Sequence, residues 1–220
     1  MATVVDLRPV LKFAAALKRN NNRDWFQAHR AEYEAARAKF ESYVAALIAD
    51  LSRTEPLTSL SPKDCIFRLN RDLRFTKDKT PYKPYLSAYI APGGRKSRRM
   101  GYYIHLEPGN CMLAGGLHEP EPQQLAAWRA AIDRNPRPLK KIIAGAAFRR
   151  YFGELQGERL KTVPRGYPKD HPEADLLRLK SVTIIRPIPE AVVTSPAFLR
   201  ESLATFQAMR PFLRYLDQLG

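Results

Sequence analysis

The fold is decided where the hydrophobic pattern changes to a period of two, in Tyr85-Leu86-Ser87-Ala88-Tyr89-Ile90 and Gly101-Tyr102-Tyr103-Ile104-His105-Leu106. Alternation of apolar and polar residues, rich in tyrosine and isoleucine, is typical of β-strands. Residues 65–69 and 111–114 have the same character, and we expect strands there too. Pro108-Gly109-Asn110 is a turn sequence, so it predicts an antiparallel hairpin between the strands on either side of it.

Helical periodicity lies on both sides of these strands. Residues 7–18 predict a short helix, and apolar residues three and four apart predict a long helix from Arg23 to about Leu51. A final strand is predicted over residues 181–186, and further helices over residues 122–134, 136–152, 173–178 and 196–218. We therefore expect a single α+β domain over residues 1–220. In this fold an antiparallel sheet of about five strands packs against the long N-terminal helix and the C-terminal helices.

The chain is strongly basic, with 37 Lys and Arg against 22 Asp and Glu and a formal net charge of +15. Two blocks hold the excess: residues 63–99 carry eleven cations and three carboxylates, and residues 134–186 carry thirteen cations and five carboxylates. If the blocks meet in the fold, they form a positive face that attracts phosphate-bearing partners, from small nucleotides to nucleic acid. The alternative is that the surplus charge only keeps the protein soluble.

Several classes of protein are disfavoured by what the sequence lacks. The longest apolar run is far short of the ~20 residues needed to cross a bilayer, and no signal peptide is expected, so the pattern predicts a cytoplasmic protein. Cys65 and Cys111 show no CxxC spacing and are expected as buried free thiols. No glycine-rich phosphate loop, GxSxG motif or zinc-type histidine spacing is present, so we predict no metal and no cofactor.

The segment with the densest chemistry runs from Phe67 to Lys83 and mixes arginines and lysines with aromatic residues, Asp72 and Asp78. Arginine presents a planar fork that suits carboxylate or phosphate, and lysine adds a point charge to the same ligand. These residue types predict an anion site. The side chains expected to bind the ligand are Arg68, Asn70, Arg71, Arg74, Lys77, Lys79, Tyr82, Lys83 and Arg165.

Arg165 belongs to a second, proline-rich segment, and we expect that segment to close over the anion site formed by residues 68–83. If the protein is an enzyme, the candidates for its acid–base groups are Asp72, Asp78, Asp170 and His171. The structural alternative remains open, because the two aspartates of residues 68–83 can simply hold that loop in place through ion pairs.

Three motifs together resemble the family called domain of unknown function 2461. They are Asn21-Asn22-Arg23-Asp24-Trp25-Phe26, the basic stretch from Arg68 to Lys83, and Lys161-Thr162-Val163-Pro164-Arg165-Gly166-Tyr167 with Asp170-His171-Pro172. Gly101-Tyr102-Tyr103 and Gly115-Gly116 extend the likeness over nearly the whole chain. The resemblance implies a bacterial single-domain protein and carries over no activity and no catalytic residue.

The leading hypothesis is therefore a site for a small phosphorylated or otherwise anionic ligand. The alternative is a nucleic-acid-binding module that uses an extended basic face with exposed tyrosines, since aromatic platforms beside cations grip single strands. The tyrosines in question are Tyr82, Tyr85, Tyr89, Tyr102 and Tyr103. The sequence gives no prediction of the oligomeric state.

Overall fold

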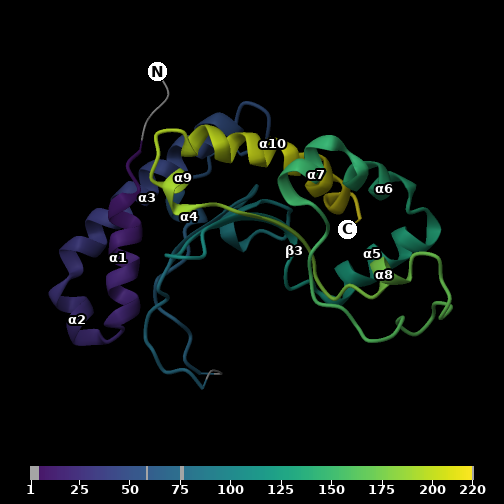
Figure 1. Ribbon diagram of the computed structural model, residues 1–220, viewed down its shortest axis with the longest axis horizontal. Coiled ribbons are helices and arrows are strands. Elements are labelled where there is room, and N and C mark those ends of the chain that lie inside the picture. Colours follow the sequence, from purple (N-terminus) through teal and green to yellow (C-terminus); the bar gives the residue numbers. More distant parts are fainter. Residues whose placement is uncertain (1–4, 58, 75–76, 220) are drawn as a thin grey trace. The chain divides into compact units, whose positions relative to one another are not determined.

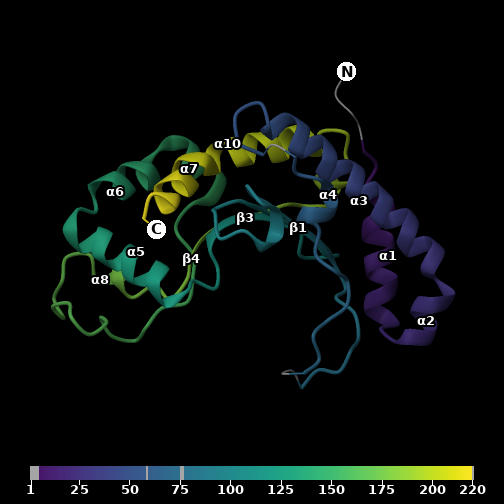
Figure 2. The same ribbon diagram turned by 180° about the vertical axis from the view of Figure 1, so that it is seen from behind.

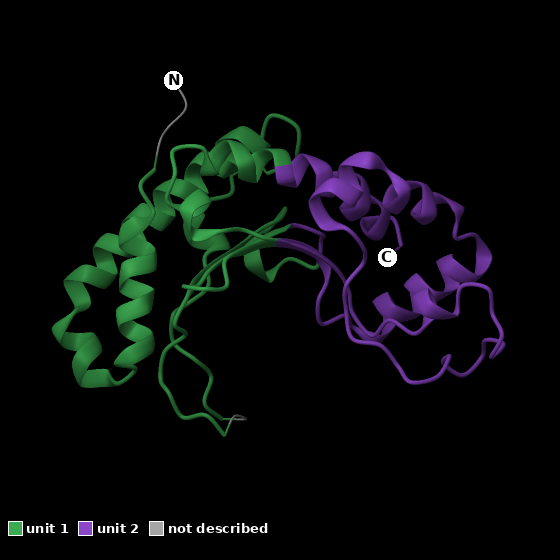
Figure 3. Ribbon diagram, in the orientation of Figure 1, with its two compact units in different colours: residues 1–98, 102–113, 187–204 green, residues 99–101, 114–186, 205–220 purple. Residues whose placement is uncertain are grey.

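The computed structural model describes residues 5–57, 59–74 and 77–219. The chain divides into two compact units that each draw on separate parts of the sequence, and Figure 3 colours them separately. The first unit contains residues 1–98, 102–113 and 187–204, and the second contains residues 99–101, 114–186 and 205–220. Whether the whole chain is a single domain stays a prediction.

The first unit begins with helices. They are α1 (Arg8–Arg19), α2 (Arg23–Ala28), α3 (Arg30–Leu51) and the short α4 (Pro62–Cys65). The single long helix predicted from Arg23 is in fact two, because His29 leaves helical geometry and its ring nitrogen Nδ1 lies 2.8 Å from the carbonyl oxygen of Trp25. The buried stripe of α3 runs from Ala36 to Leu51, as the periodicity predicts.

The strands are β1 (Leu86–Ile90), β2 (Tyr102–Leu106), β3 (Met112–Leu117) and β4 (Val182–Pro187), in the order β1-β2-β3-β4. This arrangement confirms the α+β fold with an antiparallel sheet. The prediction of about five strands is wrong, because the described residues give four. Residues 65–69 do not form the fifth: Cys65 ends α4, and Ile66 makes only an isolated bridge to Ala88.

Register divides β1 and β2 into an apolar face and a polar face. Leu86 pairs with Leu106 and Ala88 with Ile104, and all four side chains are buried. The alternate pairs, Ser87 with His105 and Tyr89 with Tyr103, point to the opposite side because side chains alternate along a strand. Neighbouring positions Tyr85 and Glu107 continue that side, which we call the polar face of the sheet.

The second unit contains α5 (Pro122–Arg134), α6 (Arg137–Ala144), α7 (Ala146–Phe152) and α8 (Ala174–Leu177). The helix predicted over residues 136–152 is interrupted at Gly145, which has extended backbone angles. The remaining helices are α9 (Glu190–Val193) and α10 (Phe198–Asp217), and α10 continues through Pro211. Within the described residues, no helix combines the length and the hydrophobicity that crossing a lipid bilayer demands.

Candidate functional site

The predicted anion-binding stretch forms a two-stranded arm in the first unit (Figures 1 and 2). We call residues 66–74 and 77–83 the basic arm. The amide N–H of Arg71 donates to the carbonyl oxygen of Pro81 at 2.9 Å, and that of Lys83 donates to Leu69 at 2.8 Å. Between these two bonds, Asn70 lies opposite Tyr82 in an antiparallel bridge. The base of the arm is fixed to β1 by the bond from the Phe67 N–H to the Ser87 carbonyl oxygen, at 3.0 Å.

The turn between α1 and α2 holds the basic arm in place. The side-chain amide of Asn21 donates to the carbonyl oxygen of Tyr82 at 2.8 Å and accepts from its N–H at 3.1 Å, as a neighbouring strand would. The Tyr82 ring is buried and stacks on Phe26, with 4.3 Å between ring centroids. The ring of Tyr82, which the sequence predicts to bind the ligand, therefore packs against α2, and its part in binding stays a prediction.

Arg71 and Asp78 join the two segments of the basic arm. The guanidinium of Arg71 pairs with the Asp78 carboxylate and donates to the Thr80 hydroxyl at 2.7 Å. Asp78 also accepts from the backbone N–H and the hydroxyl of Thr80, both at 2.9 Å. The Thr80 N–H and the Arg71 guanidinium lower the pKa of Asp78 to about 2. Asp78 is thus an ionised structural partner, and its acid–base candidacy finds no support in this geometry.

A second pair, Arg74 with Asp72, lies nearer the tip of the arm. The guanidinium of Arg74 donates to both carboxylate oxygens of Asp72, at 3.0 and 2.7 Å. The backbone N–H of Arg74 donates to one of these oxygens at 3.2 Å. These hydrogen bonds hold the pKa of Asp72 well below its usual range. Phe75 and Thr76, which complete this motif, lie outside the described residues.

At the base of the arm, Arg68, Arg71 and Lys83 come close enough for their charges to interact. Burial and then the charges of Arg68 and Arg71 lower the pKa of the Lys83 ammonium group. Its nitrogen lies 5.7 Å from the centre of the Phe67 ring, a cation–π distance. Within the described part of the chain, neither Arg68 nor the Lys83 side chain forms a hydrogen bond or an ion pair with another side chain.

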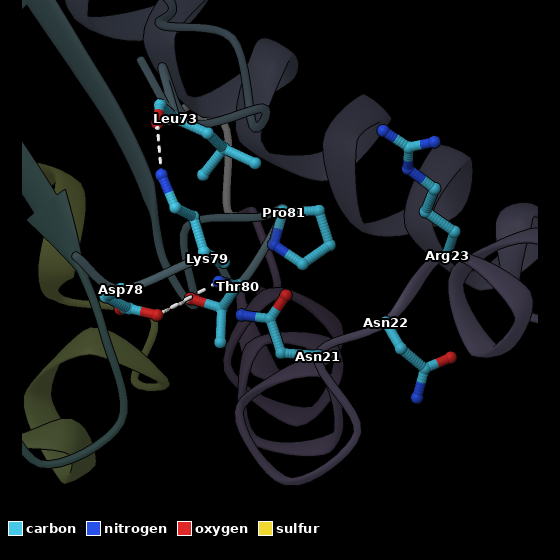
Figure 4. Close-up of a pocket in the computed structure, with 8 residues that line it drawn as sticks. All are labelled: Asn21, Asn22, Arg23, Leu73, Asp78, Lys79, Thr80 and Pro81. Carbon is cyan, nitrogen blue, oxygen red and sulfur yellow. Dashed lines mark hydrogen bonds between the residues drawn. The ribbon is translucent and has the colours of Figure 1, made fainter. Parts of the chain in front are cut away.

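An open pocket of about 560 Å³ lies between the basic arm and the turn that follows α1. Figure 4 shows it, with Asn21, Arg23, Lys79 and Pro81 among the residues that line it. The ammonium group of Lys79 donates to the carbonyl oxygen of Leu73 at 3.0 Å, so its charge is not neutralised by a carboxylate in this contact. Lys77 is exposed near the tip and lies outside this set of lining residues.

The remaining predicted residues, Arg165, Asp170 and His171, belong to the second unit. Arg165 and Asp170 are exposed. His171 is half-buried, and its Nε2 atom lies 3.2 Å from the Asp133 carboxylate. The closure of this segment over residues 68–83 stays a prediction.

The polar face of the sheet holds a hydrogen-bonded chain that the sequence did not single out as a site. The Tyr103 hydroxyl lies 3.0 Å from Nδ1 of His105, and His105 Nε2 lies 3.2 Å from the Glu107 carboxylate. Lys18 of α1 donates to the other oxygen of Glu107 at 3.0 Å. The ring of Tyr85 packs on His105, with 4.2 Å between centroids. Alternation on β2 is the one signal that places Tyr103, His105 and Glu107 on a common side.

Burial is the largest single influence on the pKa values of Tyr103, His105 and Glu107. It lowers the pKa of His105, although the hydrogen bond to Glu107 acts in the opposite direction. Burial raises the pKa of Tyr103 to about 12, so its hydroxyl is protonated at neutral pH. Burial alone would raise the pKa of Glu107, but hydrogen bonds from Lys18, His105 and Asn110 bring it below its usual value. At neutral pH these hydrogen-bonded side chains are therefore a neutral His105 imidazole between the ionised Glu107 carboxylate and the Tyr103 phenol.

Comparison with known proteins identifies the family. The family model described as Conserved hypothetical protein (DUF2461) matches residues 9–215. The chain belongs to this family. No curated protein and no solved structure matches the chain. Membership in the DUF2461 family fixes no ligand and no reaction.

Two of the motifs that mark the chain as a DUF2461 protein have structural roles in this geometry. Asn22 caps α2 by accepting a hydrogen bond from the N–H of Trp25 at 2.9 Å. The preceding residue, Asn21, makes the two hydrogen bonds to the Tyr82 backbone, which we call the polar clamp. Gly116 has a φ of +112°, and a Cβ atom there would lie 2.3 Å from the Val182 carbonyl oxygen. Arg68 and Lys83 are motif cations for which the described contacts supply no ionic partner. Among the described residues, no group of three or more His, Cys, Asp or Glu is placed to hold a metal ion.

Proposed function

We propose that the protein binds a small phosphorylated or otherwise anionic molecule in its first unit, at the base of the basic arm. The observation that carries this proposal is the environment of Lys83. Its side chain is half-buried over the Phe67 ring, and no carboxylate among the described residues pairs with its ammonium group. Because an unpaired charge is costly to remove from water, such a cation favours an anion as its partner.

Arg68 and Arg71 define the chemistry of that anion. The charges of both lower the pKa of Lys83, so the three cations repel one another. Asp78 neutralises Arg71 only. The Arg68 fork and the Lys83 ammonium group are well matched to a phosphate or a carboxylate, because an arginine fork binds two oxygens at once. A bound anion would relieve the repulsion among the three cations.

Burial of the tyrosines supports a small ligand over a nucleic acid. Tyr82 and Tyr102 are 6% and 4% exposed, and Tyr85, Tyr89 and Tyr103 are half-buried. A module that grips single strands presents aromatic faces on which bases stack, and these rings are largely taken up by packing. Nucleic acid therefore enters as the competing outcome of the test.

We place this binding function in the bacterial cytoplasm. Cys65 and Cys111 are buried free thiols, which suits a reducing compartment. Burial raises the pKa of Cys65 to about 12 and that of Cys111 to about 11, so neither thiol is reactive at neutral pH.

The test is thermal unfolding and isothermal titration at fixed moderate salt with inorganic phosphate, pyrophosphate, adenosine monophosphate, citrate and a short oligonucleotide. A small anion present at ~100 times its dissociation constant should stabilise the protein by about 2.7 kcal/mol. For a chain of this size, that free energy corresponds to a rise in Tm of roughly 5–10 °C. Lys83→Gln should abolish the shift, and Lys12→Gln, which removes an exposed lysine of α1, should retain it.

Two outcomes count against the proposal. Equal binding by wild type and Lys83→Gln would remove the site from the base of the arm. Stabilisation by the oligonucleotide alone, falling steeply as salt is raised, would favour the nucleic-acid hypothesis instead.

A further inference from the structure

The chain of hydrogen bonds on the polar face has the arrangement of an acid–base relay. A hydroxyl group, an imidazole and a carboxylate follow one another in Tyr103, His105 and Glu107, with separations of 3.0 and 3.2 Å. In catalytic triads of this kind, the carboxylate orients the imidazole and the imidazole exchanges a proton with the hydroxyl group. Here the His105 side chain is buried, and hydrogen bonds at both ring nitrogens hold it in one orientation.

The charges around the ring decide which nitrogen carries the proton. Glu107 accepts from Lys18 at 3.0 Å and is ionised, so it must accept a hydrogen bond from His105 Nε2. In the neutral imidazole, Nδ1 is then an acceptor, and the Tyr103 hydroxyl donates to it. The hydroxyl of Ser87, which pairs with His105 across the strands, lowers the pKa of Tyr103 and so opposes the effect of burial. The relay therefore points from the carboxylate outward to the phenol.

Tyr103 and the cation Lys83 both lie near one ring of the basic arm, that of Phe67. The rings of Tyr103 and Phe67 are 6.3 Å apart, and the Lys83 nitrogen lies 5.7 Å from the same Phe67 ring. Tyr85, which packs on His105, senses the charges of both Glu107 and Arg71. All of these residues belong to the first unit.

We propose that Tyr103 is a catalytic residue that takes a proton from a hydroxyl group of the bound anion, and that His105 and Glu107 form its relay. This inference rests on the proposed function, because Lys83 and Arg68 would hold the substrate. As the substrate O–H bond breaks, its proton forms a bond to the Tyr103 oxygen, and the Tyr103 proton passes to His105 Nδ1. The substrate oxygen keeps the electron pair, and the new imidazolium is stabilised by Glu107.

The substrate class that follows is a small phosphate or carboxylate that also carries a hydroxyl group. The protein residues supply a base for that hydroxyl group, and the reverse transfer returns the proton to the product. Because the Tyr103 phenol is protonated at neutral pH, it passes a proton from the substrate to His105 and is not a tyrosinate before the reaction begins.

A covalent reagent tests the relay without knowledge of the substrate. Benzenesulfonyl fluoride reacts with a phenol by forming an S–O bond as the S–F bond breaks; fluoride leaves, and His105 would accept the phenol proton. We expect labelling of Tyr103, located by peptide mass spectrometry, to slow by about 100-fold in His105→Gln. Tyr33 is the internal control: its hydroxyl accepts from Arg37 at 3.4 Å, and its labelling rate should be the same in wild type and variant.

The pH profile of wild-type labelling keeps the test decisive if His105→Gln does not fold. The rate at Tyr103 should rise as His105 loses its proton and level off above pH ~6.5, whereas a phenol without a base should continue to rise with pH. Groups that face His105 and shape this profile are Glu107, Tyr103, Tyr85 and Ser87. Absence of labelling at Tyr103, or a rate at Tyr103 that follows pH as Tyr33 does, would overturn the relay.

An anionic reagent separates failure of the relay from failure of the binding site. We expect 4-(fluorosulfonyl)benzoate to label Tyr103 at least tenfold faster than the neutral reagent, and Lys83→Gln to remove that advantage. Equal rates for the two reagents, with dependence on His105 intact, would support the relay and refute the anion site. Loss of dependence on His105, with the anionic advantage intact, would do the reverse.

Discussion

The basic arm and the polar face of the sheet are two polar regions of the same unit, and they are built in opposite ways. In the arm, ion pairs join residues close in sequence, such as Arg74 with Asp72, whose side chains are 76% and 42% exposed. On the polar face, Lys18 reaches Glu107 across 89 positions of the chain, and the His105 side chain is 9% exposed.

This difference shows that the region with the most charged residues need not be the region whose groups are best arranged for catalysis. Exposed pairs between neighbours contribute little to stability and leave carboxylates ionised and occupied. Buried networks from distant parts of the chain fix protonation states and orientation, because water does not screen them. In this protein the sequence is richest in charge along the arm, whereas the groups best arranged for proton transfer lie on the sheet.

The largest expected effect concerns how the arm is attached. Tyr82→Ala removes a ring that is 6% exposed and stacked on Phe26. We expect a loss of about 3–5 kcal/mol in the free energy of unfolding, typical of deleting a buried aromatic side chain. Urea unfolding followed by fluorescence measures it. A loss no greater than that of Asp72→Asn would mean that aromatic packing does not anchor the arm.

A smaller effect is expected for the polar clamp beside that ring. Asn21→Ala leaves both the N–H and the carbonyl group of Tyr82 without their partner. Unsatisfied buried groups cost about 1–3 kcal/mol. Asn22→Ala is the matched control, since it removes only the cap of α2 and should cost about 1 kcal/mol. If both variants unfold at the same urea concentration, the clamp contributes no more than an ordinary cap.

Local patterns predicted the sheet well, because alternation in β1 and β2 reflects one buried face. The prediction of a fifth strand was wrong for a physical reason. Residues 65–69 alternate like a strand, but Ser61 and Asp64 form a capping box at the start of α4, and Cys65 is the last residue of that helix. The sequence predicted, as the structural alternative, that Asp72 and Asp78 form ion pairs within the arm, but proximity did not give the partners, since Asp78 pairs with Arg71 seven positions away and Asp72 pairs with Arg74. Alternation on β2 places Tyr103, His105 and Glu107 on one side of the sheet, but no local pattern encodes the contact between Lys18 of α1 and Glu107.

The polar face should also make stability depend on pH. Burial lowers the pKa of His105 below its usual value of 6.5, so the unfolded chain binds a proton where the folded chain does not. The contribution of His105 to the free energy of unfolding is therefore fully present above pH ~6.5, and it is lost as the pH falls through the pKa of the folded state. We expect His105→Gln to reduce the difference in unfolding free energy between pH ~7.5 and pH ~5.5. The exposed His118 gives the control variant His118→Gln, which should keep the wild-type difference.

The smallest effects should separate the two ion pairs of the arm. The Arg71 side chain is 27% exposed and contacts both Asp78 and Thr80, so it ties the two segments together. The Arg74 side chain is 76% exposed and pairs within its own turn. We expect Arg71→Ala to lower the unfolding free energy by about 1 kcal/mol, or roughly 2–4 °C in Tm, and Arg74→Ala to leave Tm unchanged. Equal shifts would contradict the distinction between Arg71, which contacts the other segment of the arm, and Arg74, which pairs with Asp72 two positions away.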